Sequence, residues 1–158
     1  MCSSDLPQVV GRRLELFEGP WHLGDKLAAE FERPMPDGTT LKTEFHLPSL
    51  PGACRLRLAV QGMEGMGPLA PFASRLRAGD LRSEVWLNGR NVDYLNRRID
   101  RRSSEPAAAT LDLPVDALRV GSNTLEIRQT PDRKSGAFDE AEVSQLSLDL
   151  TPQGAPSE

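Results

Sequence analysis

The dipeptide Asn88-Gly89, near the middle of the chain, is the sequence feature that most limits the fold. The run before it, Ser83–Leu87, alternates apolar and polar side chains with the period of two typical of a strand buried on one face. Asparagine and glycine tolerate positive φ, so the chain can reverse within two residues and return antiparallel through Val92. The sequence therefore predicts a β-hairpin at the centre of the chain.

The same alternation recurs along the sequence and predicts about eight short strands. The expected strands cover residues 9–17, 27–31, 41–47, 56–60, 83–87, 111–115, 125–129 and 146–150. Trp21–Asp25 is expected as a loop, and Ala73–Ala78 as a single helical turn. No long amphipathic helix interrupts the strands, which excludes an α/β sheet. We therefore expect an all-β fold, a two-sheet antiparallel β-sandwich or jelly roll with little helix.

The length of 158 residues suits one domain with short tails. We expect a tether over residues 1–8, the β-sandwich over 9–150 and a flexible tail over 151–158. No apolar run approaches the length of a membrane span. The net charge of -4 argues against nucleic acid as a partner.

Cys2 suggests a possible link to a membrane. The start Met-Cys-Ser-Ser-Asp resembles the beginning of a mature bacterial lipoprotein, in which the cysteine carries the lipid. That hypothesis predicts the periplasm or the outer membrane as the location, with the membrane reached only through Cys2. The alternative is a cytoplasmic protein that has cysteine as its second residue. Cys54, which begins an expected strand, is interpreted as a structural thiol.

The stretch from Gln61 to Asp80 is rich in Gly, Pro and Met and has no sustained period. Long irregular segments inside compact domains are uncommon and often functional. Its apolar residues predict either a protein-docking surface or a segment that folds back over the core. These residues are Met63, Met66, Leu69 and Phe72.

Three segments together resemble the galactose-binding-like jelly roll, the β-sandwich of many carbohydrate-binding modules and of non-catalytic domains in glycoside hydrolases. Val85–Gly89 is similar to that family's hairpin, Leu118–Ile127 to its turn into a strand, and Glu142–Leu150 to its closing strand. The resemblance implies the sandwich fold. These motifs are turn and core features, so they do not identify a ligand.

A sugar site needs an exposed aromatic ring beside hydrogen-bonding side chains. Such rings and their polar neighbours give the candidate ligand-binding residues, which are Trp21, Asn91, Tyr94, Asn96 and Arg97. The alternative is that Trp21 plugs one end of the sandwich and Tyr94 packs on the hairpin. Four arginines within residues 97–102 could meet an anionic partner, although a solvated loop balanced by Asp100 and Glu105 is the more common explanation.

No pattern of catalytic or metal-binding residues is present. His22 and His46 lie far apart without partners at metal spacing, and no nucleophile motif occurs. We expect no cofactor and no metal. The minor alternative is calcium, which the resembled family often carries, held by Asp139, Glu140 and Glu142.

The sequence thus predicts a non-catalytic binding module of the bacterial cell envelope, whose partner is a glycan or an envelope protein. Two alternatives stay open. One is a structural or assembly lipoprotein anchored through Cys2, and the other is an accessory domain of a carbohydrate-active enzyme.

Overall fold

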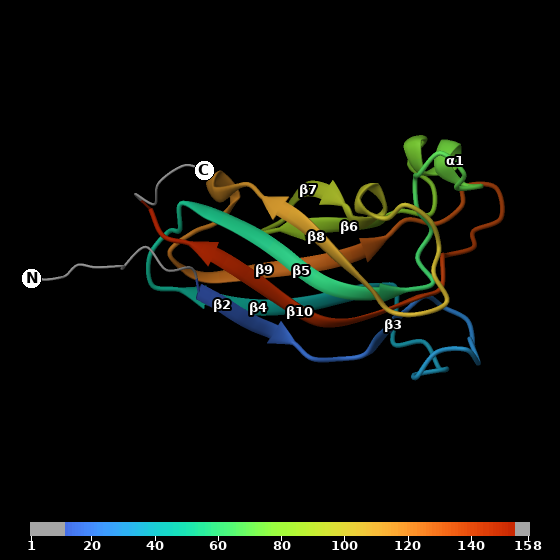
Figure 1. Cartoon of the computed structure of the whole chain (residues 1–158), viewed down its shortest axis with the longest axis horizontal. Helices are drawn as coiled ribbons and strands as arrows, with labels where there is room; N and C mark the ends of the chain where they lie inside the picture. The colour runs from blue at the N-terminus through green and yellow to red at the C-terminus, as the bar shows by residue number, and fades with distance from the viewer. Residues whose placement is uncertain (1–11, 154–158) are drawn as a thin grey trace, which may run out of the picture.

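A computed structural model describes residues 12–153, which fold into two antiparallel sheets packed face to face (Figure 1). The five-stranded sheet runs in the order β2 (Arg12–Phe17), β10 (Ala141–Thr151), β5 (Ala53–Gln61) and β8 (Ala107–Leu113), with β3 (Trp21–Leu23) also paired to β10. The four-stranded sheet runs in the order β4 (Thr40–Leu47), β9 (Gly121–Gln129), β6 (Ser83–Leu87) and β7 (Arg90–Tyr94). The predicted two-sheet jelly roll is confirmed.

Helix is confined to short turns in the described part of the chain. These are α1 (Ala73–Arg77), where a single helical turn was expected, and two 3-10 turns at Leu95–Arg98 and Val115–Ala117. No helix within residues 12–153 is long and apolar enough to cross a membrane. Cys2, the expected tether 1–8 and residues 154–158 of the expected tail lie outside the described residues.

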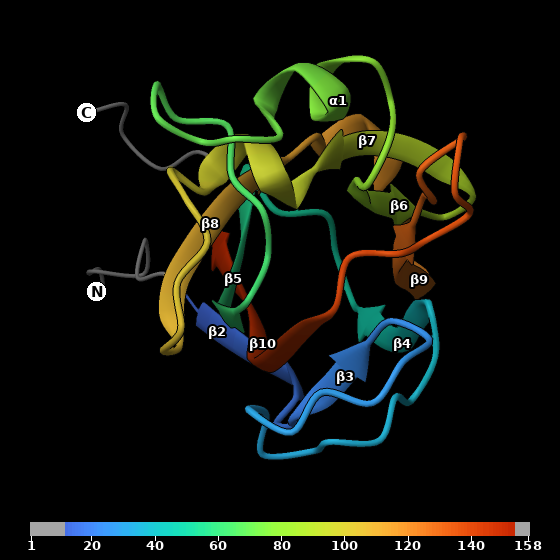
Figure 2. The ribbon, with the colours of Figure 1, turned by 90° about the vertical axis from the view of Figure 1, so that its right-hand side faces the viewer.

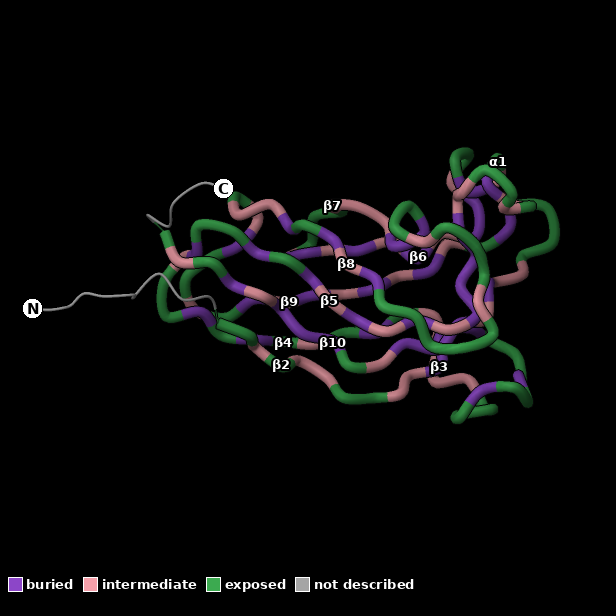
Figure 3. The backbone as a smooth tube through the Cα atoms, in the orientation of Figure 1, coloured by how far each residue is buried: buried purple, intermediate pink, exposed green. Residues whose placement is uncertain are grey.

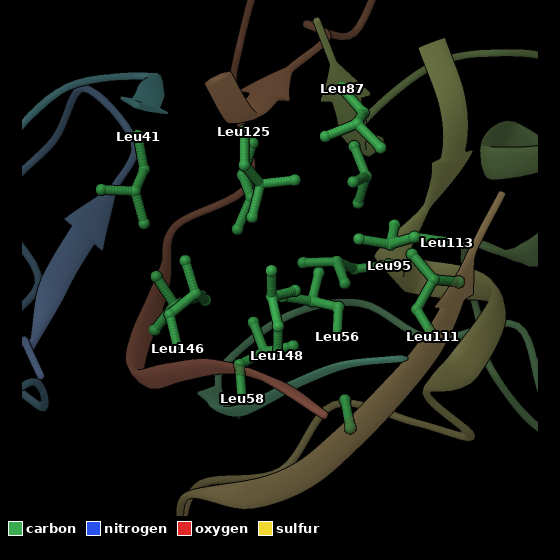
Figure 4. Packing of buried hydrophobic residues seen from close by; sticks show 14 of the residues in the cluster. Leu41, Leu56, Leu58, Leu87, Leu95, Leu111, Leu113, Leu125, Leu146 and Leu148 are labelled. Carbon is green, nitrogen blue, oxygen red and sulfur yellow. The ribbon is translucent and has the colours of Figure 1, made fainter. Parts of the chain in front are cut away.

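The core lies between the two sheets, as the end-on view in Figure 2 shows. Inward side chains alternate with outward ones along the central strands, so buried and exposed segments alternate along the backbone in Figure 3. Leucines from both sheets point toward one another in Figure 4, and each of Leu56, Leu125 and Leu148 is 0% exposed. Cys54 belongs to this core, and burial raises the pKa of its thiol to about 12, which suits a structural role.

The central hairpin forms as the sequence predicted. Leu87 pairs with Arg90, and the two turn residues have positive φ, 53° at Asn88 and 81° at Gly89. These angles match a two-residue type I′ turn, whose twist suits the flanking strands.

We expect Gly89→Ala to lower the free energy of unfolding by about 1–2 kcal/mol, the cost of the left-handed conformation for a residue with a Cβ. No atom lies within 4 Å of the added Cβ, so the cost is conformational rather than steric. Urea unfolding measures it, with the neighbouring exposed change Arg90→Ala as the control. A loss no larger than that of the control would contradict the prediction.

The hairpin turn is bonded to the second motif singled out in the sequence. The Asn88 side chain donates to the Asn123 side chain over 2.9 Å and accepts a hydrogen bond from the Thr124 amide over 2.8 Å. Two segments that lie 35 residues apart in the chain therefore form one hydrogen-bonded unit at this end of the sandwich.

The segment between Trp21 and Phe31 differs from its prediction. Trp21–Leu23 is strand β3 rather than a loop, because β10 starts at Ala141 and offers a pairing edge to it. The expected strand at 27–31 is wrong: Leu27 is 66% exposed, whereas Ala28 and Phe31 are buried. Buried positions three residues apart do not fit a strand, so this segment packs as an irregular loop.

Candidate functional site

The apolar residues of the loop between β5 and β6 do not form one exposed patch. Met63 is 1% exposed and belongs to the core, as the fold-back alternative predicted. Met66 and Phe72 are half-buried, and Leu69 is 85% exposed. A protein-docking surface built from all four residues is therefore not present in this structure.

The two aromatic residues expected to serve a sugar site lie on different sheets. Trp21, on β3, packs against the core and meets Phe17 edge to face, with 6.2 Å between ring centroids. Tyr94 ends β7, at the edge of the other sheet. Trp21 therefore takes the plugging role that was the alternative to a ligand platform.

Asn96 is a structural residue in this fold. Its side chain is 0% exposed, accepts a hydrogen bond from the Ser83 amide over 2.8 Å and donates to the Glu64 carbonyl over 2.8 Å. It ties the irregular loop after β5 to the start of β6. A ligand on the surface cannot reach its amide.

Tyr94 and Asn91 share the outer face of the four-stranded sheet with Trp86. Asn91 pairs with Trp86 across β6 and β7. An arginine covers each aromatic ring: the Arg82 guanidinium lies 4.0 Å from the Tyr94 centroid, and that of Arg128 lies 4.2 Å from the Trp86 centroid. These rings are therefore already stacked with cations rather than open to a sugar.

Arg97 lies close to Tyr94 and forms an ion pair with Asp93, so it does not contribute an unpaired positive charge to a cationic surface. Its guanidinium is 5.8 Å from the Tyr94 centroid and donates to Asp93 over 2.9 Å. The ion pair neutralises part of its charge, which makes Arg97 a weak candidate for binding an anion.

Each of the three carboxylates considered for calcium accepts a hydrogen bond from a different segment of the chain. Asp139 accepts from the Glu64 amide over 2.9 Å, and Glu142 accepts from the Arg33 amide over 2.8 Å. Glu140 accepts from His22 over 2.6 Å. Within residues 12–153 no group of three or more His, Cys, Asp or Glu side chains is arranged to hold a metal ion. These carboxylates stabilise the neighbouring segments by accepting their hydrogen bonds.

Asp139 and Glu64 form a buried acidic pair bridged by Arg102, whose guanidinium lies 3.5 Å from each carboxylate. Burial raises the pKa of Asp139 to about 7 and also raises the pKa of Glu64. Raised carboxylate pKa values are common at catalytic sites and also in structural ion networks. Neither residue lines the groove described next, so the pair fits the structural role.

An open groove of about 650 Å³ crosses the outer face of the five-stranded sheet. Its floor is a row of small side chains that are direct cross-strand neighbours, Ser144 on β10, Ala59 on β5 and Ala108 on β8. The next row is larger and polar: Ser147 pairs with both Glu15 and Arg57, and Arg57 pairs with Thr110. The groove is deep because small side chains lie beside large ones on adjacent rows.

The groove presents hydrogen-bonding groups on every strand that forms it. The polar lining residues are Arg13, Glu15, Glu32, Arg57, Thr110, Ser144, Gln145 and Ser147. Among these residues Gln145 is exposed, whereas Ser147 is only 4% exposed. Sequence reasoning missed this site because it contains no aromatic residue. The available signal was the series of small outward residues on strands that later prove adjacent.

Comparisons with known proteins support the fold. No protein-family model matches the chain, and no curated protein sequence matches it. Among solved structures, the β-porphyranase of glycoside hydrolase family 86 from the human gut bacterium Bacteroides plebeius is 12% identical at a TM-score of 0.50, covering 89% of this chain and 20% of that one. BuGH86 in complex with neoagarooctaose is 13% identical at a TM-score of 0.50, covering 90% and 19%.

A family 35 carbohydrate-binding module from an environmental isolate is 16% identical at a TM-score of 0.46, covering 90% of this chain and 96% of that one. The chain spans about a fifth of the length of the two family 86 structures. The likeness to these two structures shows the fold alone, and the β-sandwich that the sequence resemblance implied is confirmed.

Proposed function

We propose that this chain is a non-catalytic carbohydrate-binding module that binds an oligosaccharide in the groove on the outer face of the five-stranded sheet. The groove itself is the observation that carries the proposal. Its volume of about 650 Å³ is within the range of small-molecule sites, and it is lined by groups that hydrogen-bond to hydroxyls. The fold supports this, because similar domains lie within enzymes whose names refer to polysaccharides.

The proposal assigns binding rather than catalysis to the chain. Glycoside hydrolysis needs two carboxyl groups placed on either side of the scissile bond. The groove does contain two carboxylates, Glu15 on β2 and Glu32 on the β3–β4 loop. The proposal assigns both of them hydrogen bonds to sugar hydroxyls, not roles as catalytic acid and base. Location in the cell envelope, with a lipid on Cys2, stays part of the proposal and is tested by metabolic labelling of the cysteine with a fatty acid.

A tryptophan placed in the groove should abolish binding without unfolding the protein. Ala108 is exposed on the groove floor, so Ala108→Trp fills the space that a sugar would take. We expect the affinity for the bound oligosaccharide to fall at least about tenfold, since one lost contact of 1.4 kcal/mol has that effect. Calorimetric titration measures it against a panel of neoagarooctaose, xylohexaose, cellohexaose and mannohexaose, with polygalacturonate and carrageenan as charged glycans.

Glu44→Trp is the matched control, because Glu44 is exposed on the outer face of the opposite sheet. It should bind like the wild type. If no glycan of the panel binds, the proposed function fails. If Ala108→Trp binds as tightly as Glu44→Trp, a carbohydrate ligand lies elsewhere on the molecule.

A further inference from the structure

A β-bulge interrupts strand β10 at the groove. Ser144 pairs with Ala59 and Ser147 pairs with Arg57, so Gln145 and Leu146 together face the single residue Leu58 on β5. Bulges redirect side chains and are common beside binding sites. Here the bulge sends Leu146 into the core, where it is 0% exposed, and leaves Gln145 exposed at the groove.

Gln145 adopts a left-handed conformation with φ of 56°. This region is unfavourable for a residue with a Cβ, and glycine or asparagine is the usual choice. The backbone is fixed there because the main-chain N–H of Gln145 donates a hydrogen bond to the Glu18 carbonyl over 2.8 Å. A glutamine therefore occupies a position where glycine would be more stable, which points to a use for its side chain.

The Gln145 side chain has unused hydrogen-bonding capacity. Its amide makes no hydrogen bond to protein among residues 12–153, and it offers two donors and one acceptor oxygen. Amide donors and acceptors are the groups that bind sugar hydroxyls, and Gln145 is exposed beside the groove floor.

The charges of the groove favour an uncharged ligand. The two arginines that line it, Arg13 and Arg57, both pair with Asp149, at 2.9 Å and 3.3 Å. Glu15 and Glu32 add two negative charges to the lining. Asp149 neutralises only one of the two arginine charges, and together with Glu15 and Glu32 these five side chains carry a net negative charge, which disfavours an anionic sugar.

We infer that the bulge is the recognition point for an uncharged oligosaccharide, whose hydroxyls bind the exposed side-chain amide of Gln145. This inference rests on the proposed function and adds its ligand class and its central contact. Gln145 sets specificity, and the groove floor supplies the space for the chain of sugars.

Gln145→Gly and Gln145→Ala test the inference because they should change stability and affinity differently. The glycine variant removes the conformational cost and should raise the melting temperature by about 2–4 °C, whereas alanine keeps the Cβ and should leave it near the wild-type value. Both variants lose the side-chain amide of Gln145. Both should therefore bind the uncharged oligosaccharide that the wild type binds most tightly about tenfold more weakly than the wild type does. Glu44→Ala, on the opposite sheet, is the control that should change neither quantity.

The same titrations at low and high salt test the ligand class. An uncharged sugar should bind with an affinity that changes less than about twofold, because no ion pair is screened. Wild-type affinity in both Gln145 variants would overturn the inference while leaving the proposed function standing. A glycine variant that melts lower and binds less would show that the side chain supports the fold, and preferential binding of polygalacturonate or carrageenan would overturn the ligand class. No binding by any glycan would instead remove the proposed function.

Discussion

Replacing Asn123 by alanine should lower the melting temperature by about 6–12 °C, the equivalent of about 3 kcal/mol in a domain of this size. Asn123 is 1% exposed and makes four hydrogen bonds, two as acceptor from Asn88 and the Arg119 amide and two as donor to the carbonyls of Arg119 and Gly121. Alanine removes all four and leaves the half-buried Asn88 side chain and Gly121 carbonyl each without one hydrogen-bond partner, which adds to the cost. Circular dichroism melting measures the change.

Asn91→Ala is the control, because Asn91 is exposed on the edge strand β7. It should change the melting temperature by less than about 2 °C, as surface substitutions usually do. Asn88→Ala in combination with Asn123→Ala should cost less than the sum of the single changes, because the two residues share a hydrogen bond. Strict additivity would show that the two turns are stabilised independently.

Asp139→Asn should change how stability depends on pH. Burial raises the pKa of Asp139 from 3.8 to about 7, so between these values the folded protein keeps a proton that the unfolded chain loses. Folding of the wild type is therefore penalised increasingly as pH rises toward 7, and asparagine carries no such penalty. Relative to the wild type, the variant should gain about 2–3 kcal/mol in free energy of unfolding between pH 5 and pH 8.

Urea unfolding of both proteins at several pH values measures this difference, in which the titrations of groups distant from Asp139 cancel. The lowered pKa values of Asp37, Asp132 and Asp149 give stability that is lost only as pH falls below about 4, outside this window. Asp112→Asn, at an exposed surface pair with Arg55, is the control for removing a carboxyl elsewhere on the molecule. A stability difference for Asp139→Asn that does not change with pH would mean that this carboxyl ionises at its ordinary pKa.

Local pattern predicted the fold class where each strand has one buried face. Strand β4 is an example: Leu41, Phe45 and Leu47 are buried, and their period of two is visible without a partner strand. The hairpin at Asn88-Gly89 was equally readable, because positive φ depends on the residues in the turn themselves. The strand expected at 27–31 failed because the segment turns back on itself, where the Phe31 amide donates to the Ala28 carbonyl over 3.2 Å, and because the residues after it are held by Glu142, which accepts from the Glu32 and Arg33 amides.

The candidate site was not predictable in the same way. Ala59, Ala108 and Ser144 lie on three strands and become a groove floor only when β5, β8 and β10 pair in this register. Asn96 and Trp21 carried side chains suited to a ligand, and the fold placed the first fully inside and packed the second against the core.

The sequence by itself determined the two-sheet β-sandwich, its central hairpin and the strands with one buried face, because these follow from the period of side chains and the local conformational preferences of turn residues. The tertiary structure alone decided that Asn88 meets Asn123, that the acidic residues near β10 hold neighbouring loops by hydrogen bonds, and that a polar groove lined by Gln145 opens on one sheet. Those features depend on which strands become neighbours and in what register, and register is set by the packing of the whole core.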